Sequence, residues 1–139
     1  MSPVPKARTT ETTRTTRTTI VWQYPKCSTC RKALKWLGDH DVSLNAIDLV
    51  ASPPTAAKLR ELWKKSGLPL AKMFNTAGES YRAGDFKNRL ATMSEAEALG
   101  ALAADGKLIK RPLIDAGEVV LVGYDEDDLK ATFGAARRA

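Results

Sequence analysis

Apolar and polar residues follow two different periods in the first part of the chain. The segment 18–24, TTIVWQY, is β-branched and aromatic, and Pro25 cannot continue a central ladder, so we predict a strand that ends there. Over 30–37 apolar residues recur every three or four positions, which predicts an amphipathic helix with Gly38 as its stop. The loosely alternating segment 42–50 predicts a second strand, and parallel pairing of the two strands would make a βαβ unit.

The middle of the chain contains helical patterns separated by turn residues. Segment 55–66 places its large apolar residues on one face and meets Gly67 as a stop. Shorter helical pieces are expected over 70–74 and 86–93, on either side of the polar segment NTAGESYRAG. The capping-box spacing SEAE, followed by alanine and leucine, predicts a helix over 94–104.

The last part of the chain predicts a β-hairpin and a helix. Two apolar runs, KLIKRPLI at 107–114 and EVVLVGY at 118–124, are joined by a three-residue loop that contains glycine. The segment 125–133, DEDDLKATF, predicts a helix whose acidic start complements the helix dipole. The order of all elements predicts an α/β, thioredoxin-like fold (βαβ…ββα, mixed four-stranded sheet) with a helical insertion between its halves.

The start of the chain differs in composition from the rest. Residues 9–19 are a threonine-rich repeat with nothing apolar to bury, so we predict a disordered tail over 1–17 and one domain over 18–139; a transit peptide is the less favoured alternative. About half of the net charge of +6 lies in the first nineteen residues, so direct nucleic-acid binding is not expected. No stretch approaches the roughly 18 to 20 apolar residues of a membrane span, and we expect a cytoplasmic protein without membrane association.

Two cysteines three residues apart, Cys27 and Cys30, carry the candidate chemistry. A zinc site would need a second pair of ligands, and the single histidine, His40, is interpreted as a turn or surface residue, so no metal is expected. Two small core residues are the alternative to a redox pair. The position of Cys27 at a helix start favours the redox interpretation, with Cys27 as nucleophile and Cys30, on the sheltered face, as the resolving thiol of a Cys27–Cys30 disulfide.

The helix start also predicts an anion site beside the Cys27 sulfur. Unsatisfied amides of the first turn, including those of Ser28 and Thr29, point toward the sulfur and would stabilise a thiolate or a bound oxyanion, with Arg31 adding charge. Further positive charge close in sequence would lower the pKa of Cys27. The nearby cations are Lys26, Arg31 and Lys32.

The KRP segment is the second candidate part of the site. In a thioredoxin-type fold the proline that opens the strand opposite the two cysteines is cis, and Pro112 is in the position for it. Arg111 would then face the thiols. The alternative is that Lys110 and Arg111 form an ordinary solvated edge.

These segments resemble the arsenate reductase (ArsC)/Spx/MgsR family of thioredoxin-like proteins, through YPKCSTCRKALKWL, FNTAGESYR, LIKRPLI and VGYDEDDL. The resemblance covers nearly everything after Thr18. It implies a cis Pro112 and Cys27 as the redox cysteine. It also implies that Arg111 is the arginine that helps hold arsenate in the reductases and stabilises the oxidised form in Spx, and Arg31 matches the arginine four residues after the reactive cysteine.

The chain departs from the glutaredoxin-coupled arsenate reductases at several positions. Gln23 stands where they have a histidine four residues before the cysteine. Asn75 and Gly123 fall near the positions of their second and third anion-binding arginines. Two of the three anion-binding arginines of that scheme are therefore absent. Lys72 or Arg82 could compensate for the lost charge, but both are interpreted as surface charges, so the sequence argues against arsenate reduction by that particular scheme.

Two functions use the same residues. The first is a thiol-disulfide oxidoreductase of the ArsC family with no bound cofactor and with a glutathione-, glutaredoxin- or thioredoxin-type reductant as co-substrate. Cys30 stands where those reductases have serine, and the resulting CxxC is shared with Spx and MgsR. The alternative is therefore a redox-sensing regulator that binds the RNA polymerase α subunit through the region of Gly67, although Gly67 is equally explained as a helix C-cap. A redox-inactive binding module is a third possibility, which the position of Cys27 argues against.

Overall fold

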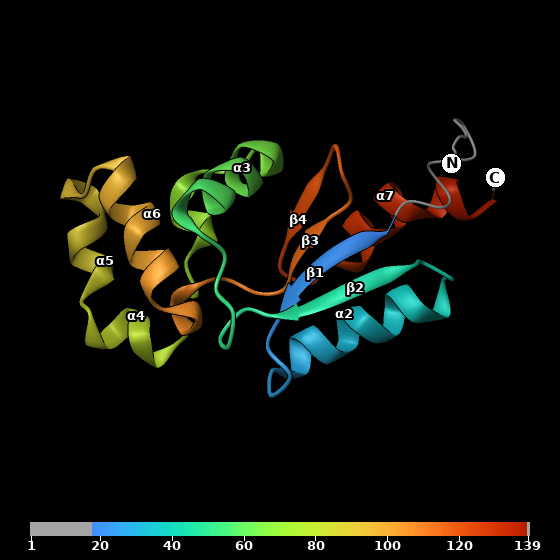
Figure 1. Ribbon diagram of the computed structural model, residues 1–139, viewed down its shortest axis with the longest axis horizontal. Coiled ribbons are helices and arrows are strands. Elements are labelled where there is room, and N and C mark those ends of the chain that lie inside the picture. The colour runs from blue at the N-terminus through green and yellow to red at the C-terminus, as the bar shows by residue number, and fades with distance from the viewer. Residues whose placement is uncertain (1–17, 139) are drawn as a thin grey trace, which may run out of the picture.

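A mixed four-stranded β-sheet lies at the centre of the computed structural model, which describes residues 18–138 (Figure 1). In the order β2-β1-β3-β4, β1 pairs in parallel with β2 and antiparallel with β3, and β3 pairs antiparallel with β4. The α/β, thioredoxin-like fold class is confirmed, whereas the predicted tail over 1–17 lies outside the described residues. The strands are β1 (Thr19–Gln23), β2 (Leu44–Asp48), β3 (Leu113–Asp115) and β4 (Val120–Val122).

Two helices, α2 (Ser28–Asp39) and α7 (Glu126–Arg138), cover one face of the sheet. They share one buried cluster with the strands beneath them, because the side chains of alternate strand residues point to the same face. α2 connects the parallel strands β1 and β2, which confirms the predicted βαβ unit. The cluster contains Val21, Ala33, Trp36, Leu37, Ile114, Leu129 and Phe133.

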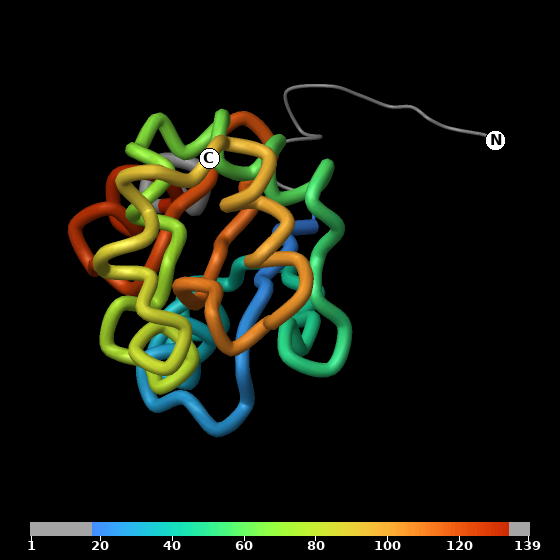
Figure 2. The backbone as a smooth tube through the Cα atoms, turned by 90° about the vertical axis from the view of Figure 1, so that its left-hand side faces the viewer, coloured from blue at the N-terminus to red at the C-terminus, as the bar shows by residue number. Residues whose placement is uncertain are grey.

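The helical insertion, residues 55–108, covers the other face and one end of the sheet (Figure 1), and Figure 2 looks onto its helices. Its side chains form a second buried cluster with the strands, which includes Leu59, Leu62, Met73, Phe74, Leu102 and Leu113. Within residues 18–138 no helix has the length and apolar character needed to cross a membrane. The insertion contains α3 (Ala56–Ser66), η1 (Leu70–Met73), α4 (Glu79–Ala83), α5 (Phe86–Arg89), η2 (Leu90–Thr92), α6 (Glu95–Ala104) and η3 (Gly106–Leu108).

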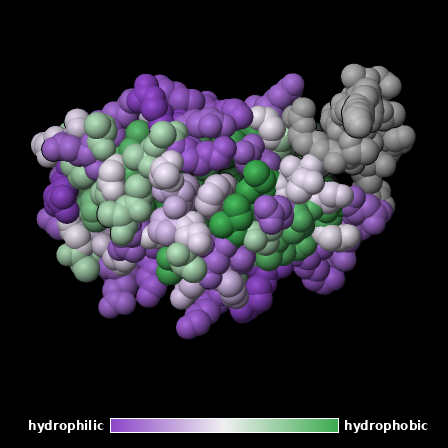
Figure 3. Space-filling view, in the orientation of Figure 1, coloured by the Kyte–Doolittle hydropathy of each residue, from purple (hydrophilic) through white to green (hydrophobic). Residues whose placement is uncertain are grey.

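The surface around the sheet is mostly hydrophilic. Figure 3 shows hydrophilic side chains over most of this side of the molecule and a smaller hydrophobic area over β1 and β2. The half-buried side chains of Ile20, Trp22 and Ile47 belong to this sheet face, as the strand register requires. The insertion therefore covers this part of the sheet less completely than the part around β3, where Leu113 is fully buried.

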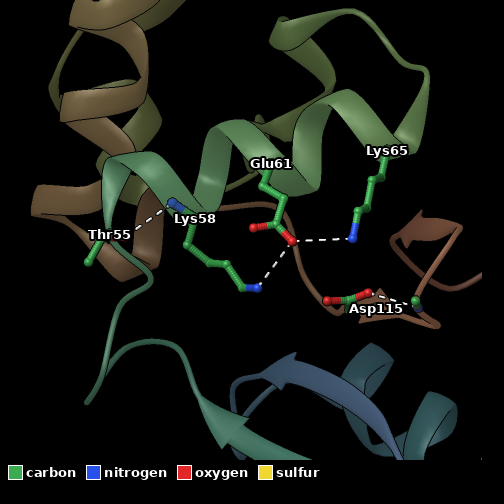
Figure 4. A network of polar contacts seen from close by, with 6 residues as sticks. Thr55, Lys58, Glu61, Lys65 and Asp115 are labelled. Atoms are coloured by element: carbon green, nitrogen blue, oxygen red, sulfur yellow. Dashed lines mark hydrogen bonds and ion pairs between the residues drawn. The ribbon is translucent and has the colours of Figure 1, made fainter. Parts of the chain in front are cut away.

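Polar side chains organise α3 and the turn after β3 (Figure 4). Thr55 caps α3 by accepting a hydrogen bond from the Lys58 amide at 3.1 Å. Hydrogen bonds from Lys65 and Lys58 lower the pKa of Glu61, but these ion pairs are solvent-exposed and contribute little to stability. Asp115 is buried, and its carboxylate accepts from the Gly117 amide at 2.9 Å, which closes the hairpin turn.

The predicted ends of two insertion helices are confirmed. Gly67 follows α3 with a φ of 71°, in the left-handed region that glycine favours. At the start of α6 the Ser94 hydroxyl accepts from the Glu97 amide at 3.1 Å, and the Glu97 carboxylate accepts from the Ser94 amide at 2.8 Å. This is a complete capping box.

We expect Ser94→Ala to lower the free energy of unfolding by about 1 kcal/mol, because the amide of Glu97 loses its acceptor. Urea denaturation followed by circular dichroism measures the change. Glu97→Gln is the matched control, since glutamine still offers an oxygen to the Ser94 amide, and it should change stability by less than about 0.5 kcal/mol. Equal effects of the two substitutions would contradict the assigned cap.

The predicted end of the first helix is wrong by a few residues. α2 continues through Gly38 to Asp39, and the left-handed residue is Asp41, with a φ of 60°. Two contacts of His40 extend the helix beyond Gly38. The His40 ring stacks on the Trp36 ring with a centroid distance of 3.7 Å, and the His40 amide donates to the Trp36 carbonyl oxygen. The interpretation of His40 as a turn residue is confirmed, since it is the C-cap of α2.

The predicted strand over 107–114 is wrong over most of its length. Its first residues form η3, Ile109 makes an isolated bridge with Phe74, and the Lys110 amide donates to the Met73 carbonyl oxygen at 2.8 Å. The segment therefore pairs with the insertion, and β3 begins only at Leu113. The polar segment NTAGESYRAG also contains a helix, α4, which the sequence did not predict; Tyr81 in α4 packs against Phe74 in the core.

Candidate active site

A tight turn presents Cys27 at the start of α2. The turn spans Tyr24 to Cys27 with Pro25 in its second position, and the Cys27 amide donates to the Tyr24 carbonyl oxygen at 2.9 Å. The Arg31 guanidinium donates to the Pro25 carbonyl oxygen at 2.9 Å and ties the first turn of α2 to this turn. Cys27 is the N-cap residue of α2, so the amides of the first helical turn lie around its sulfur.

The two thiols differ in the direction of their pKa shifts. Partial burial alone would raise the pKa of the Cys27 thiol, but the polar groups around its sulfur, beginning with the Cys30 amide and thiol, act in the opposite direction. Together with the Arg111 guanidinium and the Thr29 amide, these groups stabilise the thiolate and place the pKa of Cys27 below its ordinary value. Cys30 is fully buried, and burial raises the pKa of its thiol to about 12, although its sulfur accepts from the Tyr24 amide at 3.4 Å. Cys27 is therefore the thiol that ionises first. Both cysteines are free thiols in this structure.

Arg111 lies next to Cys27, where the chain enters β3. The Arg111–Pro112 peptide bond is cis, as predicted. The guanidinium carbon of Arg111 lies 5.1 Å from the centre of the Tyr24 ring, and one of its nitrogens donates to the Lys107 carbonyl oxygen at 3.1 Å. These two contacts hold the guanidinium in the groove wall that also contains Cys27, where its positive charge favours the thiolate and lowers the pKa of Cys27.

An open groove with a volume of about 570 Å³ has Cys27 in its wall. Two basic side chains, Lys110 and Arg111, and two acidic side chains, Asp125 and Asp128, line the same groove, so it does not have one sign of charge. In the part of the chain that the structure describes, no three His, Cys, Asp or Glu side chains are grouped to hold a metal ion. The other lining residues are Thr29, Leu68, Asn75, Ala77, Val122, Gly123 and Tyr124.

The predicted site residues have different positions relative to the groove. Ser28 is exposed and Pro112 is buried, and neither is part of the groove wall. Arg31 also lies outside the wall, because its guanidinium holds the turn before Cys27 rather than facing a ligand. Cys30 is buried beside the wall. Three predicted site residues line the groove, namely Cys27, Thr29 and Arg111.

The positions at which the sequence departs from the arsenate reductases also lie at the groove. Asn75 and Gly123 are in its wall, and Gly123 has a φ of 85° and would place an added Cβ 3.4 Å from the Lys110 side chain. Lys72 and Arg82 are exposed and lie outside the wall, so their interpretation as surface charges is confirmed.

Gln23 is a buried polar residue at the end of β1, only 7% exposed, on the sheet face that α2 covers. Its side-chain oxygen has no hydrogen-bond partner, which is uncommon for a buried polar atom. Gln23 therefore places a neutral amide, and not a titratable ring, on the side of the sheet that carries the thiols.

Sequence reasoning did not identify the aromatic and apolar residues at the site, of which Leu68, Tyr124 and Tyr24 are the largest. Leu68 and Tyr124 line the groove, and Tyr24 contacts both Arg111 and Cys30. The sequence pattern places Tyr24 only at the end of a strand. Its position directly before the turn that carries the first cysteine is the signal that could have identified it.

We expect iodoacetamide to modify Cys27 well before Cys30 in the native protein. Alkylation requires the thiolate, so the rate at Cys27 should rise through a pKa below the ordinary value of about 8.5, while Cys30 stays protonated. Peptide-resolved mass spectrometry over a pH series measures both rates. In urea the two cysteines should react alike, and equal rates in the native protein would contradict the assignment.

Comparison with known proteins gives matches over most of the chain. Residues 22–132 match the model of a family described as the ArsC family. The uncharacterized protein YusI of Bacillus subtilis is 51% identical over 112 residues, which cover 81% of this chain and 94% of YusI. The global transcriptional regulator Spx of Lactiplantibacillus plantarum is 23% identical over 111 residues, covering 80% of this chain and 83% of Spx. The crystal structure of a possible arsenate reductase from Streptococcus mutans superposes with a TM-score of 0.74 at 43% identity, covering 81% of this chain and 97% of that chain.

Proposed function

The chain belongs to the ArsC family, and on that basis we propose that it is an arsenate reductase-like thiol-disulfide oxidoreductase. The observation that carries the proposal is the placement of the two thiols, because Cys27 is the N-cap of α2 in the groove wall and Cys30 is fully buried within the same helix. This placement lowers the pKa of Cys27 and raises that of Cys30 to about 12. Two thiols tuned apart in this way divide the reaction between them, because one is ready to attack and the other keeps its proton until it is needed. The groove beside Cys27 offers space for the substrate.

The reaction proceeds in two steps on this pair. The Cys27 thiolate attacks one sulfur of a disulfide, the substrate S–S bond breaks, one half leaves as a thiolate that takes up a proton, and the other half remains on Cys27. Cys30 then loses its proton and attacks the Cys27 sulfur, which forms the Cys27–Cys30 disulfide and releases the second half as a thiol. Two electrons pass from the protein to the substrate, and a glutathione-, glutaredoxin- or thioredoxin-type thiol returns them.

The charges of the groove favour a disulfide over arsenate as the substrate. Arsenate would be reduced from As(V) to As(III) by the same two thiols, and Arg111 and Lys110 could bind it. The acidic side chains of Asp125 and Asp128 are in the same wall and repel a small anion. A disulfide that carries both positive and negative groups, or no charged group at all, is not repelled in this way.

The test uses Cys30→Ser, which removes the second step but leaves the first. Incubated with hydroxyethyl disulfide, this variant should accumulate one mercaptoethanol adduct on Cys27, and the wild type should instead form the internal disulfide, both read by intact mass. Arsenate with excess glutathione is the second arm, and arsenite formation is its readout. Absence of any adduct or turnover in both arms, together with α-subunit binding only by the oxidised protein, would overturn the enzyme proposal.

The likeness to Spx favours a second function, a redox-sensing regulator that binds the RNA polymerase α subunit. In this candidate the disulfide changes a binding surface and no substrate is turned over. Exposed residues at the end of α3 suit such a surface, since Gly67 is exposed and the next residue, Leu68, is 39% exposed. Binding of the purified α subunit should be lost in Leu68→Glu and retained in Val119→Glu, a matched control because Val119 is 43% exposed in the β-hairpin.

A further inference from the structure

Arg111 reaches Cys27 from a distant part of the chain with a side chain that has many rotamers. A half-buried arginine needs additional contacts to keep one rotamer, because ordering a long side chain has a large entropic cost. Two contacts do so here. The Lys107 carbonyl oxygen accepts from the guanidinium at 3.1 Å, and the Tyr24 ring lies 5.1 Å from the guanidinium carbon.

The Tyr24 ring is presented by a backbone that is itself fixed. Tyr24 follows β1 directly, its carbonyl oxygen accepts from the Cys27 amide, and the next carbonyl, of Pro25, accepts from Arg31. The Tyr24 amide donates to the Cys30 sulfur at 3.4 Å. Tyr24 thus contacts the buried Cys30 thiol through its backbone amide and the Arg111 guanidinium through its ring.

We propose that Tyr24 is a positioning residue that sets the reactivity of Cys27 by holding Arg111 against it. The face of an aromatic ring attracts a guanidinium, and the attraction is strongest where water is partly excluded, as at this half-buried pair. Tyr24 acts through Arg111 and needs no contact with the Cys27 sulfur. That a reactive Cys27 serves disulfide reduction rests on the proposed function, but the reactivity of Cys27 toward an alkylating reagent can be measured without any substrate.

The other groups around Cys27 do not depend on the Tyr24 ring. Lys110, Asp125 and Asp128 line the groove with Cys27, and Cys30 lies beside it in α2. Arg111 shares the groove wall with Cys27, and its guanidinium is the cation that lowers the pKa of the Cys27 thiol. A change in Cys27 reactivity on removal of the ring is therefore expected to pass through Arg111.

A double-mutant cycle tests this directly. The rate of iodoacetamide modification at Cys27 is measured against pH in the wild type, Tyr24→Phe, Tyr24→Leu, Arg111→Ala and Tyr24→Leu/Arg111→Ala. Tyr24→Leu should slow the reaction at neutral pH about two- to fivefold and move its midpoint to higher pH, and Tyr24→Phe should behave as the wild type because it keeps the ring. In the Arg111→Ala background, Tyr24→Leu should have no further effect.

Two results would overturn the proposal: an unchanged rate in Tyr24→Leu, or the same loss with and without Arg111. The second would mean that Tyr24 acts on the turn alone. If Tyr24→Leu does not fold by circular dichroism, Tyr24→Met replaces it, since methionine fills similar space without a ring. A wild type that reduces no substrate would end the proposed function and leave the outcome of this cycle unaffected.

Discussion

Replacement of Cys27 by serine is expected to lower the rate of disulfide reduction by about a thousandfold or more. A serine hydroxyl at this position is not ionised near neutral pH, so the groups that stabilise the Cys27 thiolate have no nucleophile to act on. Serine is close to cysteine in size, and the side chain is only partly buried, so the fold should be preserved. The measurement is NADPH consumption coupled through glutathione and glutathione reductase, with hydroxyethyl disulfide as substrate.

Cys30→Ser provides the matched control for Cys27→Ser. The two variants carry the same chemical change three residues apart, but only Cys27 has a lowered pKa, so Cys30→Ser should still react once with the disulfide. A Cys27→Ser protein within about tenfold of the wild-type rate would show that the nucleophile has been assigned wrongly.

Gly106→Ala is expected to have the largest effect on stability, lowering the free energy of unfolding by about 2–4 kcal/mol. Gly106 is buried at the start of η3, and an added Cβ would collide with the backbone that directly follows β2. It would contact the Leu49 carbonyl oxygen and lie 2.8 Å from the Val50 Cα. Backbone atoms cannot rotate away as a side chain can, so η3 must move. Urea denaturation measures the loss.

The same substitution elsewhere in the insertion should have the opposite sign. Gly100 is exposed within α6, and an added Cβ there has nothing within 4 Å. Gly100→Ala should therefore raise the free energy of unfolding by about 0.5–1 kcal/mol, because alanine favours the helix. If both variants changed stability in the same direction, the close approach of η3 to β2 would be contradicted.

The effect of Gly106→Ala should extend to the active site. η3 carries Lys107, whose carbonyl oxygen holds the Arg111 guanidinium. A displaced η3 would move this acceptor, and the alkylation rate at Cys27 should fall in those molecules that remain folded. Gly100→Ala should leave the rate unchanged.

The elements that could be predicted from the sequence are those with local signals. The βαβ unit, the helix from Thr55 to Gly67 and the capping box at Ser94 each depend on residues a few positions apart, so the signal lies within one window. The pairing of Arg111 with Cys27 could be predicted only because the fold class was recognised. Once the class was known, the strand after the cis-proline had to lie opposite the cysteines.

The elements that could not be predicted depend on contacts between distant segments. β3 has three residues, too few for an alternating pattern, and the residues before it pair with Phe74 and Met73 of the insertion. The groove wall combines α2 with Leu68 and Tyr124, which no local pattern connects. Tyr24 contacts Arg111 only because a turn folds its ring toward the cis-proline segment.

The position of Cys27 as N-cap of α2 has a thermodynamic consequence for the protein as a whole. Serine, aspartate and asparagine are the residues that best satisfy the free amides of a helix start. A chain with serine at position 27 would therefore have a better-capped helix and no nucleophile. We expect this inactive protein to unfold at a slightly higher temperature than the active one. The difference between the two melting temperatures measures how far the fold departs from its most stable sequence in order to keep a reactive sulfur.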